Sequence, residues 1–304
     1  MKTAHKLILI VIAAILVWKA ESISSHIASA KNYIRSEYII WKFHRPEADI
    51  SALPSLTGKG NEWFTKYHFI AHNGGIIQGR TGSDSLEAWK LSYNRGVRIF
   101  DADLSFTSDN HLVLRHSWRD DLEQDYFPGQ PTLEQFKGSL IFMKYHPMTA
   151  EDMITFMASH SDLYVAGDSK YDPAEIFSAL AETARKMNAE EVLSRVIVSL
   201  YRADDVNKVK AVYPYEHFVL RQYGWQHNWN KLADFCVKND ILAVNIFNYV
   251  IDKDPEGVKI LTSKGIRVYA AVVNSLKKLQ GYKDLGVSGA VSDYLSESDW
   301  ELLR

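Results

Sequence analysis

The fold follows from a stretch in which two apolar runs flank a helical pattern: HFIAHNGG at residues 68–75, the amphipathic segment Ser85–Asn94, and RIFDADL at residues 98–104. Short runs rich in β-branched and aromatic residues are typical of strands, and apolar residues at three- and four-residue spacing are typical of helices. A strand, a helix and a second strand in this order predict a βαβ unit, in which the two strands lie parallel in one sheet.

The same alternation continues to the end of the chain. Strand candidates begin near His68, Arg98, Leu163, Arg195, His217, Ile241, Arg267 and Ser288. Helical patterns also cover Ala150–Ser159, Pro173–Met187, Asp204–Val212, Lys231–Lys238, Pro255–Ser263 and Leu276–Asp284. Eight such units predict an α/β fold, the closed (β/α)8 barrel of the TIM type. The alternative is a doubly wound open sheet, but no glycine-rich phosphate-binding fingerprint follows any predicted strand.

Residues 67–304 are therefore predicted to form the barrel domain, with an insertion at about residues 118–148 after the second strand. Loops of this length are usually functional or carry structure of their own. We expect the insertion to cover the C-terminal face of the barrel, where enzymes of this architecture hold their active sites. The equal alternative is a surface excursion packed by its own aromatic residues.

The N-terminus has the features of an export signal. A basic segment at residues 2–6 precedes an uninterrupted apolar run at residues 7–18. This run is short for a membrane span, which needs about 20 apolar residues, and it matches the core of a signal peptide. Residues 1–20 are predicted to be a signal peptide or an uncleaved signal-anchor, and residues 21–66 a lead-in. We expect the barrel on the extracytoplasmic face, anchored to the membrane or, after cleavage, secreted or periplasmic.

Bulk composition narrows the functional classes. The formal net charge is −2, with 35 basic and 37 acidic residues, so nothing predicts the basic surface that nucleic-acid binding requires. The single cysteine, Cys236, rules out an internal disulfide. Because it lies in an amphipathic helical pattern, we interpret it as a buried core residue rather than a nucleophile. No protein partner is predicted.

Acidic residues gather where the predicted strands end. Asp101 and Asp103 share one face of the second strand, and Asp168 ends the third. Closely spaced carboxylates repel each other unless a cation lies between them. Carboxylate oxygens are ligands that Mg²⁺ and Ca²⁺ prefer. The sequence therefore predicts a divalent-metal site at this end of the barrel.

Two histidines lie at the same strand ends. His72 follows the first strand, and His116 follows the apolar run after the second. An imidazole titrates near neutral pH and can exchange protons with phosphate-ester oxygens. We expect the two histidines to act as an acid/base pair.

Four further residues are predicted to contact the substrate: Asn73, Lys170, Gln222 and Trp225. Lys170 lies two residues after Asp168 and therefore on the same face, where its charge suits a phosphate. Gln222 and Trp225 follow the fifth strand, where polar and aromatic side chains can line a pocket for a lipid or polyol. Core or surface packing is an equal alternative for this pair.

The order of these motifs resembles the glycerophosphodiester phosphodiesterases and the phosphatidylinositol-specific phospholipases C. The matching segments are His72-Asn73-Gly74-Gly75, Ser85-Leu86-Glu87-Ala88, Asp101-Ala102-Asp103, Thr107-Ser108-Asp109, Leu112-Val113-Leu114-Arg115-His116, Asp168-Ser169-Lys170 and Gly286-Val287-Ser288-Gly289-Ala290-Val291-Ser292-Asp293-Tyr294. The resemblance covers most of the chain from about Phe69 to Tyr294. It implies the two histidines as general acid and base and the three carboxylates as ligands of a divalent metal.

The chain also departs from that pattern. The arginine that follows the first histidine in the family is Asn73 here, so a bidentate phosphate contact is lost. Aspartates stand at the first and third metal positions, where their side chains are shorter, and Ser117 follows the second histidine in place of the usual aspartate. These changes point toward the broader group that includes bacterial phosphatidylinositol phospholipases C. The resemblance implies a metal-dependent phosphoric diester hydrolase acting on a small-molecule or lipid phosphodiester.

Two alternatives from other classes are open. A catalytically silent barrel acting as a membrane-associated binding module would keep the fold and lose a metal ligand or a histidine, whereas all five of these positions are kept here. A barrel glycosidase needs two carboxylates on opposite sides of a sugar-binding cleft. Asp101 and Asp103 on one strand suit a shared cation better than that arrangement.

Overall fold

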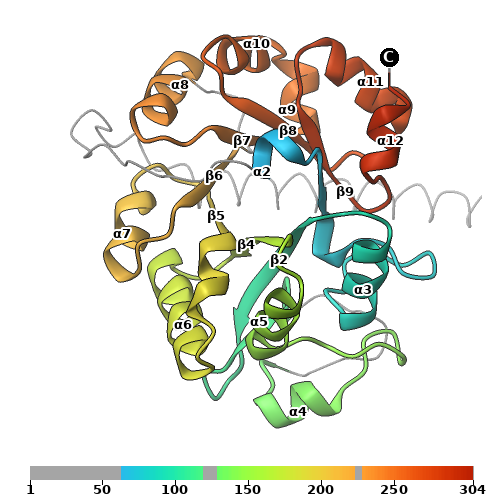
Figure 1. The fold of residues 1–304 in the computed structure, drawn as a ribbon, viewed down its shortest axis with the longest axis vertical. Helices are drawn as coiled ribbons and strands as arrows, with labels where there is room; N and C mark the ends of the chain where they lie inside the picture. Colours follow the sequence, from blue (N-terminus) through green and yellow to red (C-terminus); the bar gives the residue numbers. More distant parts are fainter. Residues whose placement is uncertain (1–62, 119–128, 223–227, 304) are drawn as a thin grey trace, which may run out of the picture. The chain divides into compact units, whose positions relative to one another are not determined.

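A computed structural model of the chain describes residues 63–118, 129–222 and 228–303. Within these ranges eight parallel strands form a closed barrel (Figure 1). They are β1 (Phe69–Ala71), β2 (Ile99–Phe106), β4 (Tyr164–Ser169), β5 (Val196–Leu200), β6 (His217–Gln222), β7 (Ala243–Phe247), β8 (Arg267–Ala271) and β9 (Gly289–Ser292). Each pairs with the next, and β1 pairs with both β2 and β9, which closes the ring. The predicted (β/α)8 barrel is confirmed.

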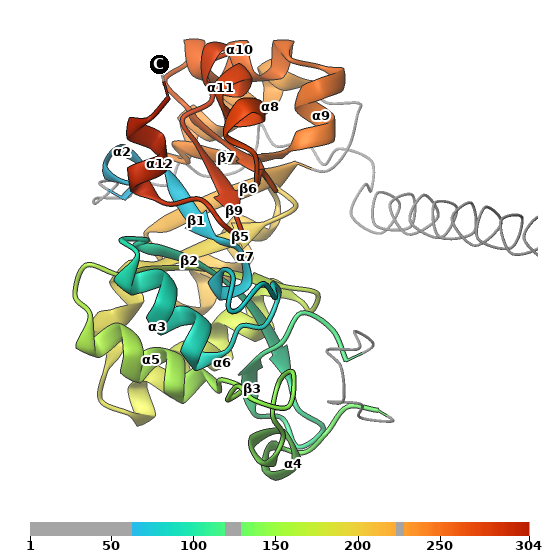
Figure 2. The ribbon, with the colours of Figure 1, turned by 90° about the vertical axis from the view of Figure 1, so that its right-hand side faces the viewer.

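Helices follow the strands and surround the barrel (Figures 1 and 2). The longer ones are α3 (Leu86–Asn94), α5 (Ala150–Ser159), α6 (Pro173–Lys186), α7 (Asp205–Val212), α8 (Trp229–Lys238), α10 (Glu256–Ser263) and α11 (Leu276–Asp284). The shorter ones are α4 (Leu133–Gly138), η3 (Glu190–Arg195), α9 (Asn248–Lys253) and α12 (Glu297–Glu301). Buried apolar residues of the longer helices and of the strands form one continuous cluster. Burial of this apolar surface is what holds the helices against the barrel.

Side-chain caps determine where several of these helices begin. Ser85 accepts a hydrogen bond from the first turn of α3, and Thr149 forms a reciprocal capping box with Asp152 in α5. Asp172 caps α6, whose first residue is Pro173. Each cap satisfies amide donors that the first helical turn leaves without an intrahelical partner, which contributes about 1 kcal/mol to stability. These residues agree with the helix starts that the sequence predicts.

The inside of the barrel changes from apolar to polar along its axis. At the N-terminal side the inward residues form an apolar cluster that includes Ile70, Ile99, Ala166, Ile197, Val219, Ala243 and Val291. Because alternate residues of a strand face the same side, the next inward positions lie two residues further on. They are His72, Asp101, Asp168, Ser199, Arg221, Asn245 and Asp293. A polar layer therefore lies over an apolar one, at the C-terminal ends of the strands.

The N-terminal end of the barrel is closed by α2 (Trp63–Lys66). Trp63, Phe64 and Tyr67 belong to the apolar cluster inside the barrel. The Tyr269 hydroxyl donates to the Tyr67 carbonyl at 2.6 Å, and the rings of Trp63 and Tyr269 lie 5.9 Å apart. Figure 2 shows α2 on the opposite side of the strands from β3. The last residues of the predicted lead-in at residues 21–66 thus pack into the core of the barrel.

A hairpin extends the C-terminal end of β2. β3 (Leu112–Leu114) pairs antiparallel with Leu104–Phe106. The predicted insertion at about residues 118–148 continues from this hairpin, and its residues 119–128 lie outside the described part. Its remainder is held against the turn, because the Asp109 carboxylate accepts a hydrogen bond from the Leu133 amide at 2.9 Å. The insertion therefore lies at the C-terminal end of β2, and its role as a substrate cover stays a prediction.

The interpretation of Cys236 as a core residue is confirmed. The side chain is fully buried in α8. Burial raises the pKa of the thiol to about 12, so the nucleophilic thiolate is scarcely populated at neutral pH.

The predicted signal peptide or signal-anchor at residues 1–20 lies outside the described residues. Among the helices that the structure describes, none combines the length and the apolar character that a membrane crossing requires.

Candidate functional site

The three predicted carboxylates meet at the C-terminal end of the barrel. Asp101 and Asp103 lie on β2, and Asp103 is paired in register with Asp168 on the neighbouring strand β4. Asp101 is 2% exposed, Asp103 5% and Asp168 3%. Burial removes water from charged groups at a high energetic cost, so each carboxylate needs a partner from the protein. The identity of those partners decides what the site can bind.

His72 is held by an acidic residue at the end of the last strand. Its Nδ1 lies 2.9 Å from an oxygen of Asp293, and the Asn274 amide donates to the other oxygen at 2.6 Å. The Asn274 carbonyl oxygen accepts in turn from the Ser292 hydroxyl at 2.9 Å. Because a carboxylate only accepts, Nδ1 carries the hydrogen of this bond and Nε2 is left for proton exchange. The chain of contacts therefore sets both the ring orientation and the tautomer of His72.

The surroundings of His72 also shift its pKa. Burial alone lowers the pKa of His72, but the hydrogen bond to Asp293 and the charges of Asp101 and Asp103 outweigh it and raise the pKa above its ordinary value. For Asp293, burial raises the pKa, while the bonds from His72 and Asn274 outweigh it and leave the pKa lowered. A raised pKa increases the population of the imidazolium form, which suits a general acid.

The turn after β1 requires glycine. Gly74 has φ +79°, and a Cβ there would lie 2.5 Å from Cδ1 of Trp89 on α3. The Ser92 hydroxyl donates to the Gly74 carbonyl at 2.7 Å. Asn73 has φ 47°, a left-handed conformation that asparagine adopts more readily than most residues. This local packing determines where His72 and Asn73 lie at the mouth of the barrel.

His116 reaches the same end of the barrel through the hairpin. The Arg115 amide donates to the Asp103 carbonyl at 2.6 Å, just beyond the paired part of β2 and β3. The Arg115 side chain is buried, and its Nε donates to the Ser117 carbonyl at 3.1 Å. His116 lies between Arg115 and Ser117 in the chain and is half-buried. The two predicted histidines thus follow β1 and β3 at the end where the carboxylates gather.

One residue of this layer, Arg221 on β6, was missed by sequence reasoning. Its Nη2 donates to an oxygen of Asp101 and, at 3.3 Å, to the Ser199 hydroxyl, while its Nη1 lies 3.3 Å from an oxygen of Asp168. Its side chain is 6% exposed. The guanidinium therefore bridges two of the three carboxylates. The available signal was the period of two in β6, in which Arg221 follows the inward-facing Val219.

The charge of Arg221 acts differently on its two partners. Burial raises the pKa of Asp168, but the charges of Arg221 and Lys170 and a hydrogen bond from Tyr201 outweigh it and lower the pKa. The Tyr201 hydroxyl lies 2.5 Å from the carboxylate and was also missed by sequence reasoning. For Asp101, burial and the neighbouring carboxylates Asp103 and Asp168 outweigh Arg221, so the pKa is raised. Asp168 is the more strongly anionic of the two.

Asp103 has a different partner. The amide of Asn73 donates to Asp103 and, at 3.3 Å, to an oxygen of Asp84. Asp84 also accepts from the Asp103 amide and from the Trp89 indole, both at 3.3 Å. Burial and the charges of Asp103 and Asp101 raise the pKa of Asp84 well above its ordinary value. The raised pKa of Asp84 reflects the buried carboxylates that surround it, which its place in an ordinary turn did not reveal.

The carboxylates do not fit a divalent cation as they lie. In residues 63–118, 129–222 and 228–303, no group of three or more histidine, cysteine, aspartate or glutamate side chains is arranged to hold a metal ion. Asp101 and Asp168 contact a guanidinium, and Asp103 contacts an amide. Mg²⁺ and Ca²⁺ need carboxylate oxygens that point at one common centre, where water can complete the coordination shell. The donor set is therefore built around a protein cation, and binding of Mg²⁺ or Ca²⁺ stays a prediction.

The residues predicted to contact the substrate differ in where they lie. Asn73 is buried beside Asp103, and Lys170 is exposed at the end of β4, near enough to lower the pKa of Asp168. Gln222 is buried at the end of β6. Trp225 lies outside the described residues. Asn73 and Lys170 thus belong to the candidate site, and the pocket predicted for Gln222 and Trp225 stays a prediction.

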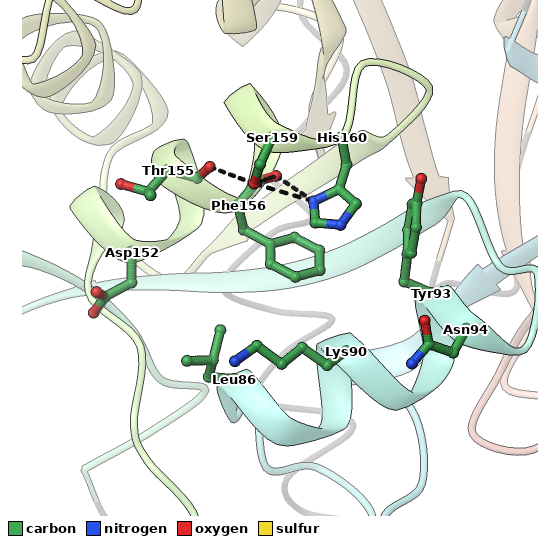
Figure 3. A pocket seen from close by; sticks show the side chains of 9 residues that line it. All are labelled: Leu86, Lys90, Tyr93, Asn94, Asp152, Thr155, Phe156, Ser159 and His160. Carbon is green, nitrogen blue, oxygen red and sulfur yellow. Dashed lines mark hydrogen bonds between the residues drawn. The ribbon is translucent and has the colours of Figure 1, made fainter.

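A separate hollow of about 410 Å³ lies between α3 and α5 (Figure 3). Its lining residues are Leu86, Lys90, Tyr93, Asn94, Asp152, Thr155, Phe156, Ser159 and His160. His160 is engaged there, because its ring stacks on Phe156 at 4.2 Å between centroids and its Nδ1 lies 2.7 Å from the Phe156 carbonyl. The hollow contains none of the predicted site residues and belongs to the outer layer of helices.

Comparison with known proteins relates this geometry to solved structures. No protein-family model matches the sequence, and no curated protein matches it. Solved structures do match in fold. A glycerophosphodiester phosphodiesterase from Parabacteroides distasonis has a TM-score of 0.61 at 18% identity, over 78% of this chain and 96% of that one.

Two further structures give the same result. A glycerophosphodiester phosphodiesterase from Thermotoga maritima has a TM-score of 0.57 at 14% identity, over 78% of this chain and 97% of that one. An Oleispira antarctica phosphodiesterase, in complex with the product sn-glycerol-3-phosphate, has a TM-score of 0.59 at 16% identity, over 75% and 93%. At these identities the likeness concerns the fold: this chain has a fold similar to that of these three phosphodiesterases.

Proposed function

We propose that the chain is a phosphoric diester hydrolase that cleaves a glycerophosphodiester or phospholipid-type substrate. The observation that carries the proposal is the His72–Asp293 pair beside an acidic layer at the C-terminal end of the barrel. The fold shared with glycerophosphodiester phosphodiesterases supports this class of reaction. The product bound in the Oleispira antarctica phosphodiesterase, sn-glycerol-3-phosphate, supports a small phosphate-bearing ligand.

The two histidines divide the proton transfers. His116 accepts the proton of the attacking hydroxyl, which belongs to water or to the substrate, and the attacking oxygen bonds to phosphorus. The bond from phosphorus to the leaving alcohol breaks, and Nε2 of His72 gives that alcohol its proton. The raised pKa of His72 supports the assignment of the acid role to this residue. General acid and base groups typically contribute about 10²- to 10⁴-fold each.

Negative charge on the phosphoryl oxygens must be met by a positive group. The sequence predicts a divalent metal for this task, held by Asp101, Asp103 and Asp168. Arg221 supplies a positive group in the same layer. The expected dependence on Mg²⁺ or Ca²⁺ is therefore measured separately from the reaction class.

The proposal is tested by diester hydrolysis with matched histidine variants. Bis(p-nitrophenyl) phosphate, glycerophosphocholine and phosphatidylinositol would each be offered with EDTA, Mg²⁺ or Ca²⁺. We expect His72→Ala and His116→Ala to lose about 10²-fold or more in kcat. His111→Ala is the control, because His111 is an exposed histidine on the same hairpin as His116.

Two results would count against the proposal. A kcat that neither site variant lowers would remove the histidines from the mechanism. A folded wild-type protein that hydrolyses no diester under any of these conditions would favour the silent barrel that acts as a binding module.

A further inference from the structure

Arg221 forms buried ion pairs inside the barrel. The guanidinium contacts Asp101 on β2, Asp168 on β4 and Ser199 on β5, and so joins four strands of the ring. Its side chain is 6% exposed, and those of its two carboxylate partners are 3% and 4% exposed. The contacts span 120 residues between Asp101 and Arg221, so they form only when the barrel closes.

This arrangement occupies the carboxylates that a metal would need. For a cation to coordinate both Asp101 and Asp168, the guanidinium would have to leave them. A buried guanidinium without partners is strongly unfavourable, because breaking one side of a buried pair leaves an uncompensated charge. A divalent cation beside an arginine that stays in place is opposed by like charge. Both routes make metal binding at these carboxylates costly.

The same guanidinium is chemically suited to a phosphodiester. Arginine stays charged at all relevant pH values and presents five N–H donors in a planar fork that matches phosphate oxygens. The position after His72, where the resemblance leads one to expect an arginine, holds Asn73, whose amide is used by Asp103 and Asp84. Arg221 thus brings a guanidinium into the site from a different strand.

We propose that Arg221 is the permanent cation of this site and takes the place of the divalent metal that three clustered carboxylates would otherwise bind. The inference rests on the phosphodiester chemistry proposed above and concerns its cation. Arg221 neutralises Asp101 and Asp168 in the resting protein and faces the phosphoryl group of the bound substrate. The protein then needs no added metal for hydrolysis.

The experiment compares cation binding and hydrolysis in the full-length chain and three variants. Arg221→Gln removes the charge, Arg221→Lys keeps a charge without the planar fork, and Arg267→Gln is the matched control. Arg267 begins β8 at the N-terminal end of the barrel and is partly exposed. Isothermal titration calorimetry with Mg²⁺ and with Ca²⁺ reports binding, and bis(p-nitrophenyl) phosphate with and without EDTA reports turnover.

We expect wild type and Arg267→Gln to bind neither ion with one-to-one stoichiometry and to keep the same kcat/KM in EDTA. Arg221→Gln should bind one ion that wild type does not bind, and should lose about 10²-fold in kcat/KM without metal. Arg221→Lys should still exclude the ion and recover part of the activity. These results distinguish an arginine that contacts the phosphate from one that only stabilises the fold. If Arg221 were only structural, kcat/KM would fall only as far as the variants lose folded protein.

The inference is overturned if the wild type binds one Mg²⁺ or Ca²⁺ that Asp168→Asn abolishes, or if EDTA removes its activity. It is also overturned if Arg221→Gln turns over substrate as fast as wild type. If Arg221→Gln fails to fold, metal binding by wild type and the effect of EDTA on its activity still test whether the site uses a metal. If wild type hydrolyses no diester, the proposed function fails, while cation binding by wild type and Arg221→Gln still tests the exclusion of metal.

Discussion

At the scale of single residues, His72 obtains its chemistry from side chains that are distant in sequence. Asp293 lies 221 positions further along the chain, and Asn274 holds it from the end of the preceding strand. The shift in the His72 pKa therefore depends on contacts that barrel closure creates. A histidine in isolation would exchange its proton near its ordinary pKa and lack a fixed orientation.

We predict that Asp293→Asn lowers the pKa of His72. The amide removes the negative charge that favours the imidazolium, and burial, which lowers the pKa, then has less opposition. The limb of the pH–rate profile that His72 sets should move to lower pH, with a lower kcat at neutral pH. The shift is measured by diester hydrolysis as a function of pH and by NMR titration of the His72 ring. If this limb of the pH–rate profile stays at the same pH, Asp293 does not act on His72.

The His72–Asp293 pair also predicts that wild type and Asp293→Asn differ in stability over a defined pH range. The raised pKa of His72 contributes stability that is full below 6.5 and is lost as pH rises through the raised value. The lowered pKa of Asp293 contributes stability that is present above 3.8 and is lost as pH falls through the lowered value. In urea unfolding, wild type should therefore have a free energy of unfolding about 1 kcal/mol higher than that of Asp293→Asn between pH 3.8 and pH 6.5. The difference should be smaller at lower and at higher pH.

A second residue-scale prediction concerns the turn that positions His72. Gly74→Ala should destabilise the fold by about 1–3 kcal/mol, because the new Cβ overlaps Trp89 and the backbone is left-handed. Gly79→Ala is the matched control, since Gly79 has φ +80° but nothing within 4 Å of the position that a Cβ would take. Urea denaturation of both variants isolates the Trp89 contact. Equal losses would mean that backbone strain, and not packing, explains the glycine.

At the scale of elements, the two ends of the barrel have separate tasks. α2 and the apolar layer close the N-terminal end, while η2 (His72–Gly74), the β2–β3 hairpin and the strand ends carry the polar groups. The apolar end stabilises the ring by burial and contains none of the candidate site residues. In (β/α)8 barrels generally, the C-terminal face carries the active site and the N-terminal face contributes to stability.

We predict that Trp63→Ala costs about 3–5 kcal/mol in unfolding free energy and leaves the kcat of the folded protein unchanged. Trp63 is 2% exposed among the aromatic residues that fill the barrel from below. Denaturant unfolding and turnover at low temperature, where the variant stays folded, measure the two effects. Loss of turnover without loss of stability would indicate that α2 influences the site directly.

At the scale of the whole molecule, we predict that the N-terminal segment directs the barrel out of the cytoplasm. Full-length protein expressed in bacteria should be found in the membrane fraction with its barrel on the extracytoplasmic face, and removal of residues 1–20 should leave the barrel inside the cell. Fractionation and mass spectrometry of the N-terminus make the measurement. A mature chain that begins after a cleavage site would establish a signal peptide, whereas full-length cytoplasmic protein would contradict export.

Much of the architecture could be predicted because its signals are local. Each strand and helix is encoded by the period of its own apolar residues, and caps such as Asp172 mark helix starts within a few positions. The alternation along β2 likewise indicated that Asp101 and Asp103 face inward. Helix α9 and helix α4 were missed, because segments of six residues carry too little periodicity to stand out.

The sequence by itself determined the barrel, the end at which polar side chains collect, and the residue types gathered there. Only the tertiary structure decided their partners: Arg221 for Asp101 and Asp168, Asn73 for Asp103, and Asp293 for His72. The physical reason is that side-chain periodicity acts over a few residues, whereas a buried charge is compensated by whichever group barrel closure brings within reach. Spacing revealed that the carboxylates need a cation, and the closed ring supplied a guanidinium.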